Sequence, residues 1–175
     1  MTKILFVPGS LRAASASRAT VRALVQRMEG KAETAVAEIG SLPHYNADVA
    51  GDPAVAEFVD AVAGAELVVF VTPEYNYSVP GVLKNAIDWA SRPAMDSVFK
   101  GKPCLVISIS GGALGGVRAQ GHLKYILNGM LAEVIPAREI VVPMANTKVE
   151  DGVLTDTAVL EFAEETLTAA LARLG

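Results

Sequence analysis

Apolar segments and amphipathic segments alternate regularly along the chain, and this alternation restricts the possible folds more than any other feature. The apolar segments are residues 3–7, 33–39, 67–71, 102–110 and 134–142. The amphipathic segments are residues 17–30, 53–63, 81–91, 117–131 and 155–173. Short β-branched runs predict strands, whereas apolar residues at every third or fourth position predict helices. Strands that alternate with helices form parallel sheets through right-handed crossovers, so the sequence predicts an α/β fold.

A chain of this kind has a preferred arrangement of its strands. We predict a five-stranded parallel sheet in the order 2-1-3-4-5 with helices on both faces, which makes a three-layer sandwich. The segment 67–71 is apolar throughout and is expected to be buried on both faces, whereas 33–39 alternates and is expected at an edge. The last strand, 134–142, is expected to break near Pro136. A length of 175 residues without a linker or repeat predicts one domain, residues 1–175.

Ligands of such a sheet bind outside the carboxyl ends of the strands, where the direction of the chain across the sheet reverses. In the predicted order this place lies beside strands 1 and 3. Three loops face it, namely residues 8–17, 72–81 and 110–116. The chemistry of these loops therefore decides which ligand the protein would hold.

The first of these loops has the character of a phosphate site. Ser10, Ser15 and Ser17 offer hydroxyl donors, and Ser17 is expected to cap the helix that follows. Free backbone N–H groups and the positive end of the helix dipole favour an anion there, and Arg12 adds a forked contact. The loop lacks the Gly-Lys-Ser/Thr of a Walker A loop and the spaced glycines of a dinucleotide fingerprint, which favours a terminal monophosphate. An ordinary capped helix beside a polar loop explains the same residues equally well.

The second and third loops suit a flat ring system better than a phosphate. Pro73 and Pro80 restrict the backbone of the second loop, and Tyr75 and Tyr77 supply flat contact surfaces. The glycines in SGGALGG, residues 110–116, allow the backbone to approach a planar ligand closely. The alternative is a solvent-exposed turn whose tyrosines pack on a neighbouring subunit. A phosphate site beside a site for a polar-edged ring matches the shape of flavin mononucleotide, FMN.

These loops also carry a family resemblance. The segments GSLRAASAS, LPHYNAD, TPEYNYSVPGVLKNAIDWASR and SISGGALGGVRAQGHLKYIL resemble the NAD(P)H-dependent FMN reductase family, and within it the bacterial quinone and chromate reductases. The resemblance covers the chain up to about Leu131 and is loose from Ala132 onward. It implies a flavodoxin-like fold with bound FMN. The residues it assigns to the cofactor are Ser10, Leu11, Arg12, Ser15, Ala16, Ser17, Pro73, Glu74, Tyr75, Asn76, Tyr77, Ser110 and Gly111.

The resemblance divides this set between the two ends of the cofactor. The serines and Arg12 would hold the phosphate, while residues 73–77, with Ser110 and Gly111 nearby, would line the isoalloxazine ring. The family often has Asn where this chain has Ser17. A hydroxyl at that position still caps a helix and donates to a phosphate, so FMN binding is expected to be retained.

The implied activity is that of an FMN-dependent NAD(P)H oxidoreductase. Hydride would pass from NADPH or NADH through FMN to quinones, with free flavin, azo dyes or chromate as further acceptors. Because the cofactor performs the chemistry, no catalytic acid–base side chain is expected, and Glu74 is expected to cap backbone groups instead. The main alternative is a non-enzymatic electron carrier of the flavodoxin type. A receiver-type signalling domain is disfavoured, because residues 8–10 contain no acidic residue and residues 72–74 contain no phosphoacceptor aspartate.

Charge and composition restrict the partners and the location. A net charge of -4 argues against binding to nucleic acid, because the phosphate backbone would be repelled. A hydrophobic content of 51% is high for a soluble monomer, so some apolar surface is expected in a subunit interface. The resemblance implies a homodimer or homotetramer. The apolar run at the amino terminus is too short for a membrane span or a signal sequence, so a cytoplasmic location is expected.

The remaining reactive side chains have simpler interpretations. His44 and His122 lie without Cys or carboxylate at ligand spacing, so no metal site is expected. Cys104 falls in a β-branched run and is expected to be a buried strand residue rather than a nucleophile. Trp89 has the helical spacing of a core or interface residue. Arg118 has two possible roles, a contact across subunits or a place near the nicotinamide, and the sequence does not choose between them.

Overall fold

The computed structural model, which describes residues 1–174, is built around a parallel β-sheet with the strand order β2-β1-β3-β4-β5. A further strand, β6, also pairs with β4. The strands of this sheet are β1 (Lys3–Pro8), β2 (Glu33–Val36), β3 (Leu67–Pro73), β4 (Pro103–Ile109), β5 (Glu133–Val134) and β6 (Ile140–Val142). The order confirms the predicted 2-1-3-4-5 arrangement.

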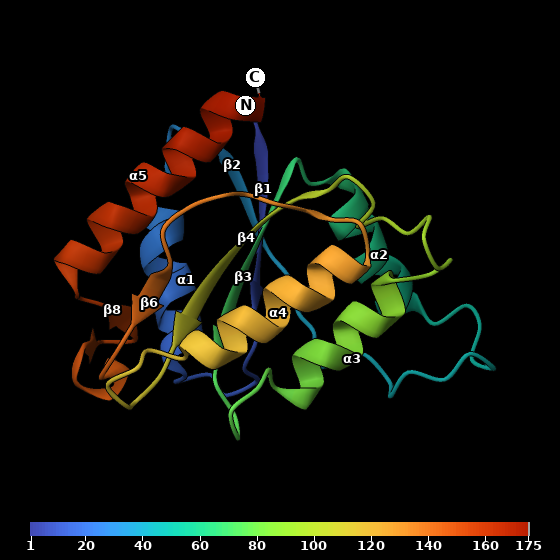
Figure 1. Ribbon diagram of the computed structural model, residues 1–175, viewed down its shortest axis with the longest axis horizontal. Coiled ribbons are helices and arrows are strands. Elements are labelled where there is room, and N and C mark those ends of the chain that lie inside the picture. The colour runs from blue at the N-terminus through green and yellow to red at the C-terminus, as the bar shows by residue number, and fades with distance from the viewer. Residues whose placement is uncertain (175) are drawn as a thin grey trace.

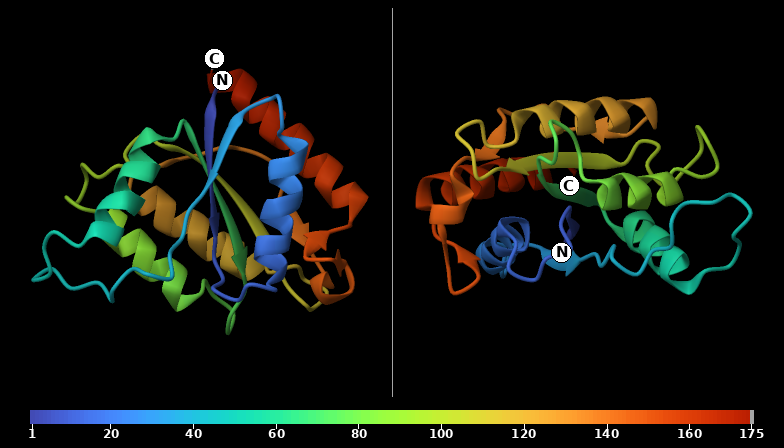
Figure 2. Two further views of the ribbon diagram at one scale, coloured as in Figure 1. Left: turned by 180° about the vertical axis from the view of Figure 1, so that it is seen from behind. Right: turned by 90° about the horizontal axis from the view of Figure 1, so that it is seen from below.

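Helices cover both faces of the sheet and complete the three predicted layers. The helices are α1 (Ala16–Arg27), α2 (Pro53–Gly64), α3 (Gly81–Ala90), α4 (Val117–Gly129) and α5 (Thr157–Leu174). Side chains of α1 and α5 pack on one face, and side chains of α2, α3 and α4 pack on the other. Figure 1 shows α3 and α4 in front of the strands, and Figure 2 shows α1 from the opposite side.

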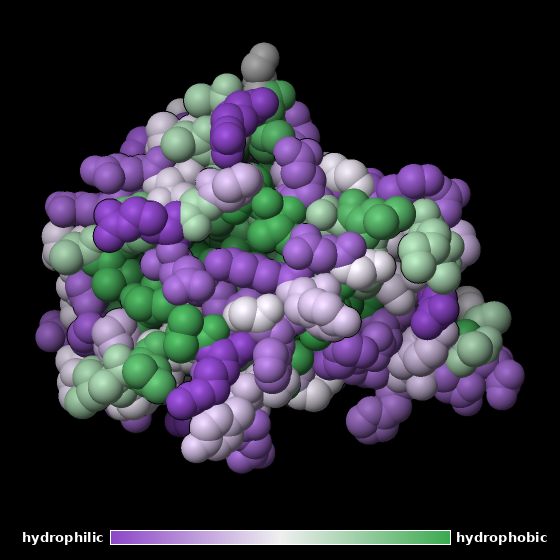
Figure 3. All heavy atoms as spheres, in the orientation of Figure 1, coloured by the Kyte–Doolittle hydropathy of each residue, from purple (hydrophilic) through white to green (hydrophobic). Residues whose placement is uncertain are grey.

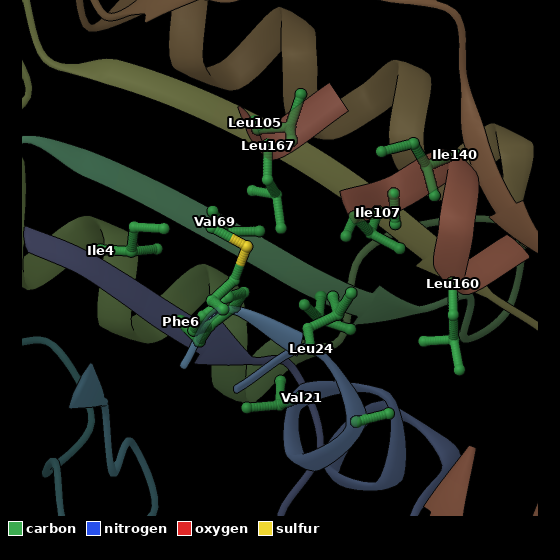
Figure 4. Close-up of a cluster of buried hydrophobic side chains, with 14 of the residues drawn as sticks. Ile4, Phe6, Val21, Leu24, Val69, Leu105, Ile107, Ile140, Leu160 and Leu167 are labelled. Atoms are coloured by element: carbon green, nitrogen blue, oxygen red, sulfur yellow. The ribbon is translucent and has the colours of Figure 1, made fainter. Parts of the chain in front are cut away.

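The core has two halves because the side chains of each strand alternate between the faces of the sheet. In β3, Leu67, Val69 and Val71 point towards α1 and α5, whereas Val68 and Phe70 point towards the other helical layer. Figure 4 shows the half of the core that lies under α1 and α5. Burial on both faces explains why this strand is apolar throughout.

The predicted last strand is two short strands. Residues of β5 pair with the beginning of β4, at Pro103 and Cys104, and residues of β6 pair with its end, at 107–109. Pro136 lies between them and has no backbone N–H to continue the ladder. This outcome confirms the expected break. A small antiparallel hairpin, β7 (Val149–Glu150) and β8 (Val153–Leu154), follows after the short 3-10 helix η1 (Ala145–Thr147).

The second strand is shorter than predicted, because it ends at Val36 rather than Ile39. As an edge strand it pairs only with β1. The Ala37 N–H still donates to the Phe6 carbonyl at 2.9 Å, but the next ladder bond would need an N–H at Pro8. Proline lacks that hydrogen, so the ladder stops there and the chain leaves the sheet.

The carboxyl ends of β1, β3 and β4 meet at the lower edge of the molecule in Figure 1, and the amino terminus and the end of α5 lie at the opposite edge. The loops after β1, β3 and β4 are therefore neighbours, as the predicted topology requires. None of the helices described within residues 1–174 is long and apolar enough to cross a membrane.

Candidate functional site

A cavity opens where the loops after β1, β3 and β4 meet. The predicted cofactor residues that line it are Ser10, Arg12, Ser15, Ala16, Ser17, Pro73, Glu74, Tyr75, Ser110 and Gly111. The other lining residues are Ala14, Ile109, Ala145 and Asn146. Leu11, Asn76 and Tyr77 also belong to the predicted set, but they do not line this cavity. The fold thus brings together residues that are about a hundred positions apart in the chain.

At one end of the cavity the structure corrects the predicted helix cap. Ser15, rather than Ser17, caps α1, because its backbone is extended (φ -76°, ψ 145°) and its Oγ accepts the Arg18 N–H at 3.2 Å. Ser17 lies inside the first turn of the helix. Its side chain is therefore free of the capping contact and faces the cavity.

Ser17 is the most informative residue at this end. Only 1% of it is exposed, and its Oγ has no hydrogen-bond partner within residues 1–174. A buried hydroxyl without a partner costs roughly 1–3 kcal/mol, so such groups usually meet a ligand or water. The first turn of α1 holds no acidic residue. A buried hydroxyl, free N–H groups and the positive end of a helix dipole together fit a phosphate.

The two arginines near this end have different surroundings. Arg18 forms a forked ion pair with Glu38, with both N–O distances at 2.8 Å, and its Nε donates to the Ser10 carbonyl at 3.3 Å. Hydrogen bonding to Arg18 lowers the pKa of Glu38, and the same bond raises the pKa of Arg18. Arg12 forms no ion pair within the described chain. Arg18 therefore braces the loop, whereas no carboxylate within residues 1–174 neutralises the charge of Arg12.

The loop after β3 is a tight turn that sends its two tyrosines in different directions. Tyr75 and Ser78 exchange two backbone hydrogen bonds, at 3.0 and 3.1 Å, and Asn76 and Tyr77 between them have positive φ angles of 50° and 67°. This is the geometry of a type I′ turn. The Tyr75 hydroxyl lies 3.3 Å from Ser10 Oγ, whereas the Tyr77 ring lies 4.5 Å below the guanidinium of Arg118.

Glu74 caps the amino terminus of α4, as predicted. Its Oε2 accepts the backbone N–H groups of Arg118 and Ala119 at 3.1 and 3.3 Å, and its Oε1 accepts Arg118 Nη1 at 3.1 Å. Gly116, the residue at the cap position, has no side chain to make these bonds. Arg118 is thus held within its own chain by Glu74 and Tyr77. These contacts fix the loop after β3 to the start of α4.

Replacing Glu74 with alanine should lower the free energy of unfolding by about 1–2 kcal/mol, because two N–H groups of α4 and a guanidinium lose their acceptor. Urea denaturation followed by far-ultraviolet circular dichroism measures this loss. Glu29→Ala removes an exposed carboxylate and serves as the control. Equal stability of the two variants would contradict the capping role.

Asn146 was missed by the sequence reasoning. An added Cβ on Gly111 would lie 2.8 Å from Asn146 Nδ2, so the absence of a side chain at Gly111 lets the amide approach the cavity wall. The Ala145 N–H donates to the Ser110 carbonyl at 2.9 Å, which holds the two loops together. The rule that drew attention to loops after strands 1, 3 and 4 also applies to the loop after the last strand.

Cys104 is buried in β4, as predicted, and desolvation raises the pKa of its thiol to about 12. Because the thiolate is the reactive form, we expect the folded protein to react with a chromogenic disulfide reagent at pH 8 at least about 100-fold more slowly than the protein unfolded in guanidinium. Absorbance of the released chromophore measures the rate. Equal rates in the two states would show that the thiol is accessible.

The other residues considered from sequence have structural roles. Trp89 is 8% exposed and its Nε1 donates to the Pro43 carbonyl at 2.8 Å, which confirms a core position. His122 Nδ1 lies 3.0 Å from Ser78 Oγ at the outer side of the turn. Across residues 1–174, no group of three or more His, Cys, Asp or Glu side chains is arranged to hold a metal ion.

Comparison with known proteins agrees with this geometry. The profile of a family described as NADPH-dependent FMN reductase matches residues 2–147. The match continues past Ala132, where the sequence reasoning had expected it to weaken, and it includes Asn146. It therefore covers all three predicted loops and the additional loop after β6.

Individual relatives cover nearly the whole chain. A quinone reductase of Escherichia coli strain K12 is 39% identical over 174 residues, which are 95% of this chain and 92% of the relative. An NAD(P)H-dependent FMN reductase of Pseudomonas aeruginosa is 36% identical over 171 residues, with the same shares of 95% and 92%. A solved structure of a flavoenzyme NAD(P)H:acceptor oxidoreductase from Paracoccus denitrificans has a TM-score of 0.86 at 33% identity, covering 99% of this chain and 97% of that one.

Proposed function

The chain belongs to the NADPH-dependent FMN reductase family. We therefore propose that the cavity beside β1, β3 and β4 is its FMN site and that the protein reduces quinones. Membership makes the chain an FMN-dependent NAD(P)H oxidoreductase with the flavodoxin-like fold. The enzymatic interpretation therefore replaces that of a non-enzymatic electron carrier. The observation that carries the assignment of the cavity is the buried Ser17 hydroxyl, which has no hydrogen-bond partner in the described part of the chain.

The phosphate end of FMN would be held by the loop after β1 and the start of α1. Ser10, Ser15 and Ser17 offer hydroxyl groups, and Arg12 offers a positive charge that has no ion-pair partner among residues 1–174. The N–H groups of the first turn add to this set, since only that of Arg18 is taken by the Ser15 cap. Arg18 would not bind the phosphate, because Glu38 already neutralises it.

The ring end would be lined by two loops that the structure fixes to each other. Pro73 and Glu74 follow β3, and Ser110 and Gly111 follow β4. The Glu74 N–H donates to the Ile109 carbonyl at 3.3 Å, so the spacing of the two loops is set before any ligand binds. When bound, FMN supplies the hydride-transfer chemistry, and the chain positions its ring. Leu11, Asn76 and Tyr77 would border the site from outside the cavity.

A quinone is the proposed acceptor because several relatives are named for it. One is a 2-hydroxy-1,4-benzoquinone reductase of Burkholderia sp, 46% identical over 124 residues, which are 70% of this chain and 68% of that relative. Free flavin, azo dyes and chromate are further acceptors to be tested. The single carboxylate in the cavity lining, that of Glu74, is occupied by α4, so no side-chain acid or base is assigned to the reaction.

We further propose a cytoplasmic homodimer or homotetramer. Figure 3 shows hydrophobic residues exposed between α5 and α4, where the connection from β5 to β6 passes. A groove there is lined by apolar groups that include Ile135, Phe162 and Ala169. Analytical ultracentrifugation of the purified protein gives the oligomeric state, and a monomer at micromolar concentration would contradict the proposal. Cell fractionation tests the location.

Purification and kinetics test the function itself. The purified protein should be yellow, should retain FMN, and should oxidise NADPH or NADH when 1,4-benzoquinone is added. Colourless protein that cannot take up FMN would refute the assigned cavity. A yellow protein that oxidises neither nucleotide in the presence of quinones, free flavin, azo dyes or chromate would restore the electron-carrier interpretation.

A further inference from the structure

The Tyr75 side chain reaches from the loop after β3 to the loop after β1, residues 9–15. Its hydroxyl lies 3.3 Å from Ser10 Oγ, and Ser10 is only 2% exposed. Both side chains line the same cavity as Arg12, Ser15 and Ser17. The phenol hydroxyl of Tyr75 therefore reaches the cluster of serine hydroxyls from the opposite wall of the crevice.

The backbone that carries this side chain is fixed on both sides of Tyr75. The residue after Tyr75 begins the two-residue turn that Tyr75 and Ser78 close with two hydrogen bonds. The residue before it, Glu74, is tied to β4 through its N–H and to α4 through its carboxylate. Because this segment of backbone is already ordered, less conformational freedom is lost there when a ligand binds.

The contact between the two hydroxyl groups uses only one of their two protons, so one hydroxyl remains a free hydrogen-bond donor. Either atom can be the donor in the contact between Ser10 and Tyr75, and the other hydroxyl then keeps its own proton free. The hydroxyl pair lines the same cavity as the start of α1 and Arg12, and Arg12 has no ion-pair partner among residues 1–174. A helix amino terminus and a free positive charge suit an anion. Hydroxyl groups that donate to a charged oxygen form stronger bonds than neutral pairs do.

We propose that the Tyr75 hydroxyl donates a hydrogen bond to the terminal phosphate of FMN and so makes the crevice select FMN over riboflavin. This role rests on the proposed FMN site and adds a specificity-determining residue to it. It also replaces the expectation that Tyr75 lies along the isoalloxazine ring. Tyr77, whose ring contacts Arg118 and which does not line the cavity, has no part in it.

The test compares the binding of two flavins that differ only in the phosphate. Apoprotein is titrated with FMN and with riboflavin, and quenching of flavin fluorescence gives both dissociation constants. Tyr75→Phe should weaken FMN binding roughly tenfold, while riboflavin binding changes by less than about twofold. Tyr125→Phe, on the exposed side of α4, is the matched control and should change neither constant. Equal weakening of both flavins would make Tyr75 a ring contact and overturn the proposal.

A double-mutant cycle separates a direct contact from an effect through Ser10. If Tyr75 binds the phosphate itself, Tyr75→Phe should still weaken FMN binding severalfold in a Ser10→Ala background. If it only holds Ser10 in place, Tyr75→Phe should have no further effect there, and the proposal would be wrong. Wild-type protein that binds FMN no better than riboflavin would instead refute the phosphate site, so the two failures can be told apart.

Discussion

Ser15→Asp should weaken FMN binding at least a hundredfold without unfolding the protein. Ser15 caps α1 and lines the proposed phosphate site, so its substitution affects both the helix cap and the phosphate site. Aspartate is as good a helix cap as serine, and its charge suits the positive end of the helix dipole. The same charge repels a phosphate, since two like charges about 4 Å apart interact with roughly 4 kcal/mol near a protein surface. Titration of the apoprotein with FMN measures the loss.

Ser15→Asn is the matched control for this experiment. Asparagine also caps helices but brings no charge, so it should weaken FMN binding far less than aspartate does. The thermal midpoint of the Ser15→Asp apoprotein should equal or exceed that of the wild type. Riboflavin, which has no phosphate, should bind both variants similarly. FMN affinities that are equal in the two variants would show that the phosphate does not lie at the start of α1.

Gly116→Ala should lower the free energy of unfolding by about 2–4 kcal/mol, the sum of the costs of positive φ and of overpacking. Gly116 has a φ of 81°, a backbone conformation that residues with a side chain rarely adopt. An added Cβ would lie 2.9 Å from the Ile109 carbonyl oxygen and 3.1 Å from the Ile109 nitrogen. These are backbone atoms of β4 and cannot move aside cheaply. Urea denaturation measures the change.

A second glycine in the same helix provides the control. Gly121 lies inside α4, and an added Cβ there would meet nothing within 4 Å. Gly121→Ala should therefore stabilise the protein by about 0.4–1 kcal/mol, because alanine restricts the unfolded chain and favours a helix. Gly116→Ala with the stability of Gly121→Ala would show that the start of α4 can move away from β4.

Much of the fold could be predicted because the residue pattern of each strand reflects which of its faces are buried. The run at 67–71 has no polar residue, since both faces of β3 are covered by helices. The end of a strand was harder to predict where a single hydrogen atom determines it. The second strand ends early because Pro8, on the neighbouring strand β1, has no N–H to continue the ladder. The sequence pattern within residues 33–39 does not reveal this.

The site could be predicted as a meeting of loops, but its internal assignments could not. Ser15 and Ser17 are both suitable helix caps, and only the extended backbone of Ser15 decides between them. The opposite directions of Tyr75 and Tyr77 follow from a turn with positive φ at Asn76 and Tyr77, which is uncommon for a tyrosine. Asn146 reaches the cavity only because β6 pairs with the end of β4.

By itself, the sequence determined the layer architecture, the strand order and the family, because hydrophobic periodicity and loop motifs are local properties of the chain. It also determined which loops would meet, since parallel strands end at one edge of a sheet. The tertiary structure alone decided what each polar group in those loops contacts. A hydroxyl or guanidinium bonds to whatever lies within about 3 Å of it. For Ser10, Glu74 and Arg18 that neighbour comes from a distant part of the chain.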